Sequence, residues 1–197
     1  MASHPRAVLA IEPGGMFFDT NILIYAQDRA DPFKQLRAQE TMDAAIQADC
    51  LVISTQVMQE FYAVAVRKRW MSPAQAHSLL VRLAEHTVVP ASADSVLRGV
   101  ALQQREQLSI WDALVVQAAL DARCSVLFSE DLQEGRRYAS PAGAGPELRV
   151  VNPFNAPASA PVLAVHEASA TYGAVAKQRR TGRVGKSPAI KRPAAKR

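Results

Sequence analysis

Short apolar runs alternate along this sequence with longer segments of helical periodicity. The runs expected as strands are 16–18, 51–53, 87–89, 125–128 and 149–151. The segments expected as helices are 20–27, 32–48, 55–68, 73–86, 92–107 and 109–123. Because a helix that links two neighbouring strands leaves them parallel, this alternation predicts an α/β fold in three layers. A central, mainly parallel sheet of about five strands would lie between helices.

The charge is distributed very unevenly along the chain. Residues 155–197 hold nine of the 23 Lys and Arg and one of the 18 acidic residues, so this segment carries +8 and the rest carries −3. The segment is rich in Ala, Pro and Lys, a composition that buries too little apolar surface to fold. We therefore expect a disordered leader at 1–15, a domain at 16–154 and a disordered basic tail at 155–197.

Several classes of protein are excluded by composition. No apolar run reaches the roughly 18–20 residues that span a bilayer, so no membrane association is expected. Glu12 and Pro13 interrupt the early apolar stretch, which makes a poor secretion signal. The cysteines, Cys50 and Cys124, form neither a disulfide framework nor a zinc-type spacing. A reducing cytoplasm is the expected setting.

Four acidic residues occupy informative positions. Asp19 and Asp131 follow the first and fourth expected strands, whereas Glu60 and Asp112 lie on expected helices. Asp19 could simply cap a helix, and Asp112 stands three residues after Ser109 as in a capping box. Glu60 has apolar helical neighbours, so it needs a basic partner or a metal.

Taken together, the four acids indicate a metal site. The carboxyl ends of parallel strands lie at one edge of a sheet, where such folds bind ligands. Converging carboxylates repel one another unless a cation neutralises them, and oxygen ligands favour Mg²⁺ or Mn²⁺. Mg²⁺ held by carboxylates is suited to phosphodiester hydrolysis.

The segments around these acids resemble the motifs of PIN-domain nucleases. The matching segments are 17–25 (Phe-Phe-Asp-Thr-Asn-Ile-Leu-Ile-Tyr), 59–61 (Gln-Glu-Phe), 109–114 (Ser-Ile-Trp-Asp-Ala-Leu), 127–135 (Leu-Phe-Ser-Glu-Asp-Leu-Gln-Glu-Gly) and 151–154 (Val-Asn-Pro-Phe). Their order and spacing are similar to those of the family from residue 16 to 154. Met16 stands where family members often begin, and the tail after Phe154 lies outside the family pattern.

The resemblance implies a VapC-type ribonuclease, the toxin of a bacterial toxin–antitoxin pair. It implies that Asp19, Glu60, Asp112 and Asp131 are the catalytic, metal-binding acids, with Mg²⁺ as cofactor and Mn²⁺ as substitute. Thr20 and Ser129 would be hydroxyl neighbours that orient the ligands or water. The resemblance also implies an RNA substrate, a homodimer and a small antitoxin partner.

Two basic clusters lie near these motifs. The first holds Arg67, Lys68 and Arg69 beside Trp70, and the second holds Arg136 and Arg137. Both are expected to contact RNA phosphates, because an acidic centre needs cations at its rim to hold a polyanion. The alternative for the first cluster is that it complements the dipole at the C-terminal end of a helix, and the alternative for the second is a solvated loop. Two other functions stay open: a PIN nuclease of RNA maturation or repair, and a non-catalytic nucleic-acid-binding protein that uses its tail.

Overall fold

The computed structural model describes residues 14–139 and 145–155. They form a six-stranded sheet in the order β3-β2-β1-β4-β6-β5. All neighbouring pairs are parallel except β5 and β6. The strands are β1 (Gly15–Phe18), β2 (Leu51–Ser54), β3 (Thr87–Val89), β4 (Cys124–Phe128), β5 (Arg137–Tyr138) and β6 (Leu148–Val151). The predicted α/β fold with a mainly parallel sheet is confirmed.

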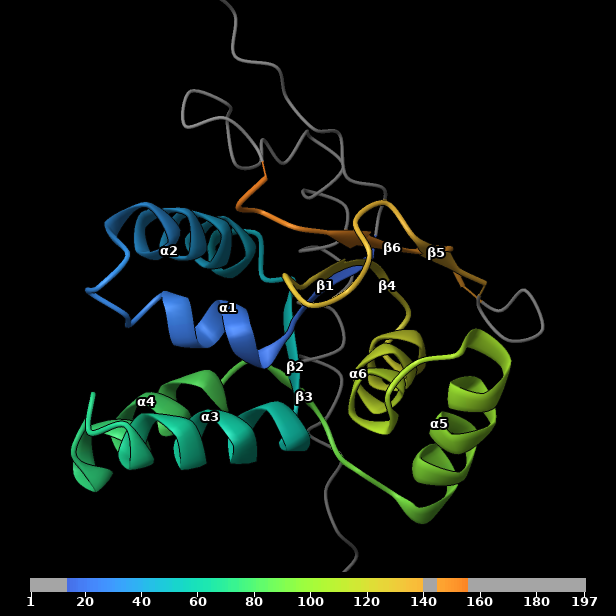
Figure 1. Ribbon diagram of the computed structural model, residues 1–197, viewed down its shortest axis with the longest axis horizontal. Helices are drawn as coiled ribbons and strands as arrows, with labels where there is room; N and C mark the ends of the chain where they lie inside the picture. The colour runs from blue at the N-terminus through green and yellow to red at the C-terminus, as the bar shows by residue number, and fades with distance from the viewer. Residues whose placement is uncertain (1–13, 140–144, 156–197) are drawn as a thin grey trace, which may run out of the picture.

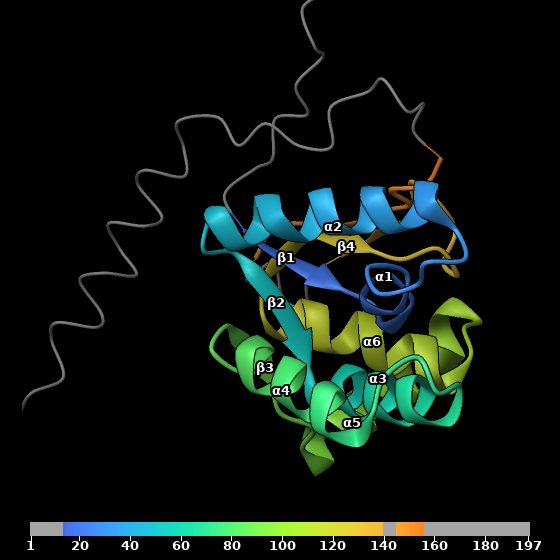
Figure 2. The same cartoon turned by 90° about the vertical axis from the view of Figure 1, so that its left-hand side faces the viewer.

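Six helices surround the sheet. They are α1 (Thr20–Tyr25), α2 (Pro32–Gln47), α3 (Thr55–Arg67), α4 (Pro73–Leu83), α5 (Ala93–Glu106) and α6 (Ile110–Asp121). Helix α2 covers one face, α6 and α3 lie under the other, and α1 follows the end of β1 (Figures 1 and 2). Gly99 allows α5 to approach α6 closely, since a Cβ there would come within 2.7 Å of a Leu114 methyl group.

The helices begin where the sequence predicts. Ser54, Ser72, Ser92 and Ser109 are the N-caps of α3, α4, α5 and α6, and each accepts a hydrogen bond from a backbone N–H of the first turn. The helices end up to three residues earlier than expected, for example at Leu83 rather than at residue 86. The last residues of those patterns form turns that lead into the strands.

The sheet differs from expectation in one strand. The sequence predicts no strand between the runs at 125–128 and 149–151, yet this stretch contains β5, which pairs antiparallel with β6 through Arg137 and Tyr138. A two-residue strand has no hydrophobic period to read, so the sheet has six strands rather than five. The first strand also begins at Gly15, one residue before the expected domain boundary.

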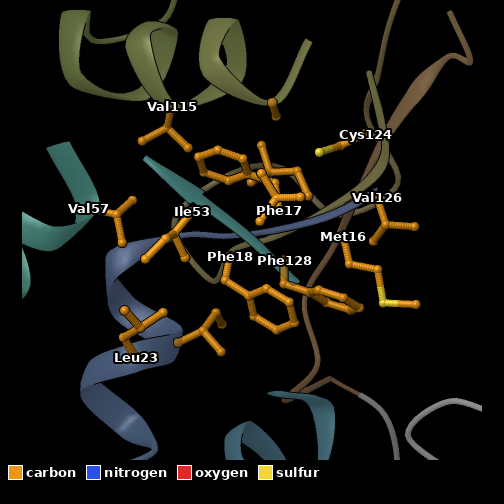
Figure 3. Packing of buried hydrophobic residues seen from close by; sticks show 14 of the residues in the cluster. Met16, Phe17, Phe18, Leu23, Ile53, Val57, Val115, Cys124, Val126 and Phe128 are labelled. Atoms are coloured by element: carbon orange, nitrogen blue, oxygen red, sulfur yellow. The ribbon is translucent and has the colours of Figure 1, made fainter. Parts of the chain in front are cut away.

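The core is built on the central strands β1 and β4. Phe17, Phe18 and Phe128 are fully buried, and the rings of Phe18 and Phe128 lie 5.0 Å apart (Figure 3). Both faces of β1 are covered by helices, which explains why its whole apolar run is buried. The residues that follow β1 and β4 therefore lie side by side at the end of two rigidly packed strands.

The predictions of a disordered leader and a disordered tail fall largely outside the described residues. This holds for positions 1–13 of the expected leader and 156–197 of the expected tail. Within the described part of the chain, no helix is long and apolar enough to cross a membrane.

Candidate active site

Asp19 lies at the junction of β1 and α1. The pairing of Phe18 with Phe128 places Asp19 beside Ser129, and the Asp19 N–H donates to the Phe128 carbonyl at 3.0 Å. The side chain caps α1 by accepting from the Thr20 N–H at 2.6 Å. Its other oxygen accepts from the Ser129 hydroxyl at 2.7 Å. Asp19 is therefore a helix cap, as the simpler interpretation had it, and also a buried carboxylate that faces the end of β4.

Asp131 is joined to Asp19 by two shared neighbours. The Asn21 side-chain amide donates to Oδ2 of Asp131 at 3.0 Å and to Oδ2 of Asp19 at 3.2 Å. The Ser129 hydroxyl, which donates to Asp19, accepts from the Asp131 N–H at 3.2 Å. Because one amide bridges both carboxylates, the two acids at the strand ends converge as the sequence predicts.

Glu60 lies on α3 and points toward the same edge of the sheet. Its Oε2 accepts from the Thr20 hydroxyl at 2.7 Å, and its Oε1 accepts from the Gln56 amide at 2.9 Å. No Lys or Arg of the described residues forms an ion pair with Glu60. The basic partner that could have explained this carboxylate is thus not found in that part of the chain, and neutral donors orient it instead.

Asp112 lies in the first turn of α6. Its N–H donates to the Ser109 hydroxyl at 3.1 Å, but the reciprocal bond of a full capping box is not formed. Gln56 links this turn to Glu60, since its amide also donates to the Trp111 carbonyl at 3.4 Å. The Asp112 carboxylate accepts no hydrogen bond from the described residues, and it is only partly exposed.

The Tyr138 side chain lies within the electrostatic reach of Asp112. Burial raises the pKa of Tyr138, and the negative charges of Glu106 and Asp112 raise it further against the opposing charge of Arg136. The hydroxyl is buried without a hydrogen-bond partner among the described residues, although a buried tyrosine hydroxyl usually finds one. This side of the site therefore holds an unpaired hydroxyl as well as an unpaired carboxylate.

The pKa of Asp19 reflects its buried position among these acids. Burial raises its pKa to about 6, against 3.8 for a free side chain, and the charges of Asp131 and Glu60 add to the rise. The hydrogen bonds from Ser129 and Thr20 act in the opposite direction. A buried carboxylate whose pKa is raised beside other acids is typical of sites that bind a cation or exchange protons.

The donor set matches a hard divalent cation in chemistry. Every candidate ligand is an oxygen, and the Asn21 amide already holds the Asp19 and Asp131 carboxylates together. Within residues 14–139 and 145–155, no three His, Cys, Asp or Glu side chains are placed to hold an ion by themselves. Mg²⁺ commonly uses one or two carboxylates and keeps several waters, so a pair of acids at the centre fits this ion.

Comparison with known proteins assigns the family. The PIN domain family matches residues 16–139. The chain belongs to the PIN domain family. A comparison with curated proteins finds no significant match.

Solved structures similar to this PIN domain include three from toxin systems. A toxin–antitoxin complex from Klebsiella pneumoniae is 23% identical with a TM-score of 0.48, over 71% of this chain and 98% of the other. The sarcin-ricin loop cleaving toxin VapC20 of Mycobacterium tuberculosis is 17% identical with a TM-score of 0.46, over 59% and 92%. DNA-bound VapBC from Salmonella typhimurium is 14% identical with a TM-score of 0.48, over 71% and 98%.

The predicted RNA-binding arginines of the PIN domain differ in their surroundings. Arg136 donates to the Glu106 carbonyl at 2.8 Å and pairs with the Glu106 carboxylate at 3.1 Å. Arg137 pairs with Glu147 at 2.7 Å on the surface. RNA phosphates at the predicted positions would therefore compete with acidic partners within the domain for both arginines.

The cluster at the end of α3 has no such partners within the described part of the chain. Arg67, Lys68 and Arg69 are exposed and form no ion pair with the described residues. Lys68 lies over the Trp70 ring, with 4.7 Å from Nζ to the centroid. Arg67 lies seven positions after Glu60, which places the two on one stripe of the helix roughly 10 Å apart.

Three site residues of the PIN domain were missed from the sequence. Asn21 bridges the strand-end acids, Gln56 orients Glu60, and Lys34 pairs with Glu130 next to Asp131. Asn21 stands two residues after Asp19 at a helix start, so its position was a usable signal. The positions of Gln56 and Lys34 depend on tertiary packing, and no sequence spacing reports that.

Proposed function

We propose that this PIN domain is a divalent-metal-dependent endoribonuclease. The observation that carries the proposal is the convergence of Asp19, Asp131 and Glu60 at one edge of the sheet, with no Lys or Arg of the described residues paired to any of the three. A structural role would favour neutralised acids, because each unpaired carboxylate destabilises the other two. Such an arrangement is maintained where a cation binds.

The residues divide into ligands and supports. Asp19, Asp131 and Asp112 would hold Mg²⁺, with Mn²⁺ as a substitute, either directly or through water. When bound, the ion supplies positive charge at the scissile phosphate and activates water for attack. Thr20 and Gln56 fix the Glu60 carboxylate for a role in orienting the attacking water. Ser129 and Asn21 hold the two strand-end acids next to each other by hydrogen bonds.

The substrate would approach from the end of α3. Arg67 shares a helix stripe with Glu60, and Arg67, Lys68 and Arg69 carry no competing acid in the described part of the chain. Trp70 adds an aromatic surface of the kind on which unpaired RNA bases stack. Arg136 and Arg137 would contribute only by exchanging Glu106 and Glu147 for phosphate.

Cleavage of a single-stranded RNA by the purified chain tests the proposal. Cleavage should require Mg²⁺ or Mn²⁺, stop with EDTA, and return when excess metal is added. Because water is the attacking group, the products should carry a 5′-phosphate and a 3′-hydroxyl. Cleavage that persists in EDTA and leaves a 2′,3′-cyclic phosphate would refute the mechanism, because the neighbouring 2′-hydroxyl would then be the nucleophile.

We further propose that the nuclease is the toxin of a toxin–antitoxin pair. The support is the similarity of its motifs to VapC-type toxins, and it extends to a homodimer, a small antitoxin partner and a cytoplasmic location. Expression of the chain alone should slow bacterial growth, and Asp131→Asn should relieve the effect. The exposed Asp43→Asn on α2 is the matched control and should remain toxic. Harmless wild-type expression at high level would favour the alternative, a PIN nuclease of RNA maturation or repair.

A further inference from the structure

A pocket lies at the carboxyl edge of the sheet, at the ends of β2 and β3. Its floor is the start of α3, and its walls are the first turn of α5 and the middle of α6. It holds about 360 Å³ of space, partly open to solvent, which is within the roughly 300–1,000 Å³ of small-ligand sites. Most of the side chains that line it are apolar: Val89, Pro90, Ala91, Val96, Leu114 and Ala118. The pocket therefore suits a mainly apolar group of small-molecule size.

Gln56 forms the wall between this pocket and the acidic site. It lines the pocket, and its side-chain amide donates to Oε1 of Glu60 at 2.9 Å. The same amide donates to the Trp111 carbonyl at 3.4 Å, which ties the start of α3 to the first turn of α6, where Asp112 lies. A nucleotide whose phosphate lies at the acids would thus have a neighbouring base within reach of the pocket.

The Trp111 side chain is exposed beside this pocket. It is 63% exposed, although Trp is on average among the more buried residue types. Trp111 precedes Leu114 by three residues and Ala118 by seven, so it shares a helix stripe with two side chains that line the pocket. The hydrogen bond from Gln56 holds the backbone that carries it. The indole therefore offers, at the edge of the pocket, the kind of surface on which unpaired RNA bases stack.

The Thr55 hydroxyl gives the pocket a polar group that a ligand can use. Its oxygen accepts from the Ala91 N–H at 3.0 Å, and it donates to no residue in the described part of the chain. The hydroxyl hydrogen can therefore be donated to a ring nitrogen or a carbonyl oxygen, which every nucleobase carries. An aliphatic side chain of a protein partner could not accept from it. The size of the pocket, the exposed indole and this donor together favour a base.

We infer that this pocket binds one unstacked nucleobase of the RNA substrate and that Trp111 stacks on that base. The inference rests on the proposed nuclease function. Glu60 lies between the pocket, at the start of α3, and the basic cluster at its end, which consists of Arg67, Lys68 and Arg69. RNA that runs along α3 would place a base in the pocket, the scissile phosphate at the acids and further phosphates on the cluster. Because bases and not phosphates carry sequence information, the pocket gives the nuclease its sequence preference.

Binding of strands with and without bases tests the pocket directly. Asp19→Asn, which is expected to cleave far more slowly, is combined with Trp70→Phe, so that Trp111 is the one tryptophan left in the chain. The two probes are a short oligoadenylate and an abasic oligonucleotide of the same length, which carry equal phosphate charge. In Mg²⁺, the oligoadenylate should quench the Trp111 fluorescence and bind about tenfold more tightly than the abasic strand.

Two substitutions in this background separate the pocket from the rest of the surface. Ala118→Leu fills the pocket, and Trp111→Leu removes the indole. Each should weaken oligoadenylate binding about tenfold, measured by anisotropy of the labelled strand, and leave binding of the abasic strand unchanged. Ile46→Ala is the matched control, since Ile46 is an exposed apolar residue near the end of α2, at the opposite edge of the sheet. Thermal melting of each chain confirms that the domain is folded.

Three results would overturn the inference. The first is equal affinity of the parent chain for the two strands. The second is oligoadenylate binding by Ala118→Leu as tight as that of its parent, because the base would then lie outside the pocket. The third is loss of a dimer in Trp111→Leu, measured by light scattering, because Trp111 would then be a subunit contact.

Cleavage by the wild-type chain separates this inference from the proposed function. If the wild type cleaves no RNA with Mg²⁺, the nuclease proposal fails, while the binding comparison still decides the pocket. If the wild type cleaves and the two strands bind equally, the pocket alone fails. If both proposals hold, one abasic nucleotide moved along a cleavable RNA should slow wild-type cleavage about tenfold at one position relative to the cut bond. It should not slow the Trp111→Leu variant further, because the two changes remove the same contact.

Discussion

The acids carried by strands and those carried by helices are held in different ways. Asp19 is 8% exposed and accepts hydrogen bonds from Thr20, Asn21 and Ser129, and the Asn21 amide ties it to Asp131. Asp112, at the start of α6, accepts none from the described residues. Glu60 lies between these extremes, with two neutral donors.

This difference shows which half of the site is organised before metal binds. The strand-end acids are fixed by the rigid pairing of β1 with β4, and burial, with a further contribution from the charges of Asp131 and Glu60, raises the pKa of Asp19. The helix-borne Asp112 carries no such constraint, so it is free to complete a ligand set. We therefore expect changes on the strand side to alter stability and chemistry together, and changes at Asp112 to alter chemistry alone.

The largest effect is expected from Asp19→Asn. Removing this charge should lower the cleavage rate at least about 1,000-fold, because a metal ion supplies several kcal/mol of charge stabilisation in the transition state. The variant should fold, since an amide is cheaper to bury than a carboxylate. Single-turnover cleavage with Mg²⁺ measures the loss, and Asp43→Asn on the outer helix α2 is the control. Activity within tenfold of wild type would remove Asp19 from the site.

A smaller loss, about 100-fold, is expected for Asp112→Asn, because other acids still hold the ion. Its melting temperature in EDTA should equal that of wild type, since the carboxylate accepts no hydrogen bond from the described residues. Cleavage and thermal melting of the same preparation test both expectations. A fall in melting temperature comparable to that of a core substitution would show that Asp112 is structural and that the fold constrains it as it constrains Asp19.

The raised pKa of Asp19 also makes stability depend on pH. The folded pKa of about 6 exceeds the ordinary 3.8, so the folded state binds this proton more tightly. The resulting stabilisation is complete below about pH 3.8 and is lost as the pH rises through 6, by up to about 3 kcal/mol. Urea unfolding in EDTA from pH 4 to 7.5 should show this loss for wild type and not for Asp19→Asn. Identical pH profiles would contradict the assignment of this titration to Asp19.

The smallest effect is expected from Gln56→Ala. This substitution removes one of two donors to Glu60 and leaves Thr20 in place, so cleavage should fall by about tenfold or less. Gln39→Ala on α2, whose amide donates to the Ala26 carbonyl, is a control for removal of a glutamine hydrogen bond away from the acids. A loss as large as that of Asp19→Asn would mean that Gln56 itself contacts the substrate or the metal.

The strand-end acids could be predicted because few arrangements satisfy their sequence context. An apolar run buried on both faces must lie within a parallel sheet, and the residue after such a run must emerge at its carboxyl edge. Asp19 and Asp131 obey this rule. The sequence also predicts that Glu60 joins them, although helix periodicity alone does not specify which strand end a helix faces.

Other features depended on contacts that sequence spacing does not encode. The strand β5 has two residues and gains its place by pairing with β6. Arg136 and Arg137 are basic residues in the motif region, yet their acidic partners come from α5 and from Glu147 in the segment before β6. Side-chain pairing of this kind is decided by tertiary geometry, so the sequence could predict a basic cluster but not its availability.

Titration of the Asp19 carboxyl carbon by NMR, with and without Mg²⁺, shows whether a divalent cation binds at this carboxylate. Without metal, the pKa should lie near 6, because burial and the charges of Asp131 and Glu60 favour the protonated form. Saturating Mg²⁺ should lower it by more than one unit, since a cation on the carboxylate favours ionisation. A pKa near 6 that Mg²⁺ does not change would show that no ion binds at this carboxylate, and the account of the site as a metal-dependent nuclease centre would be contradicted.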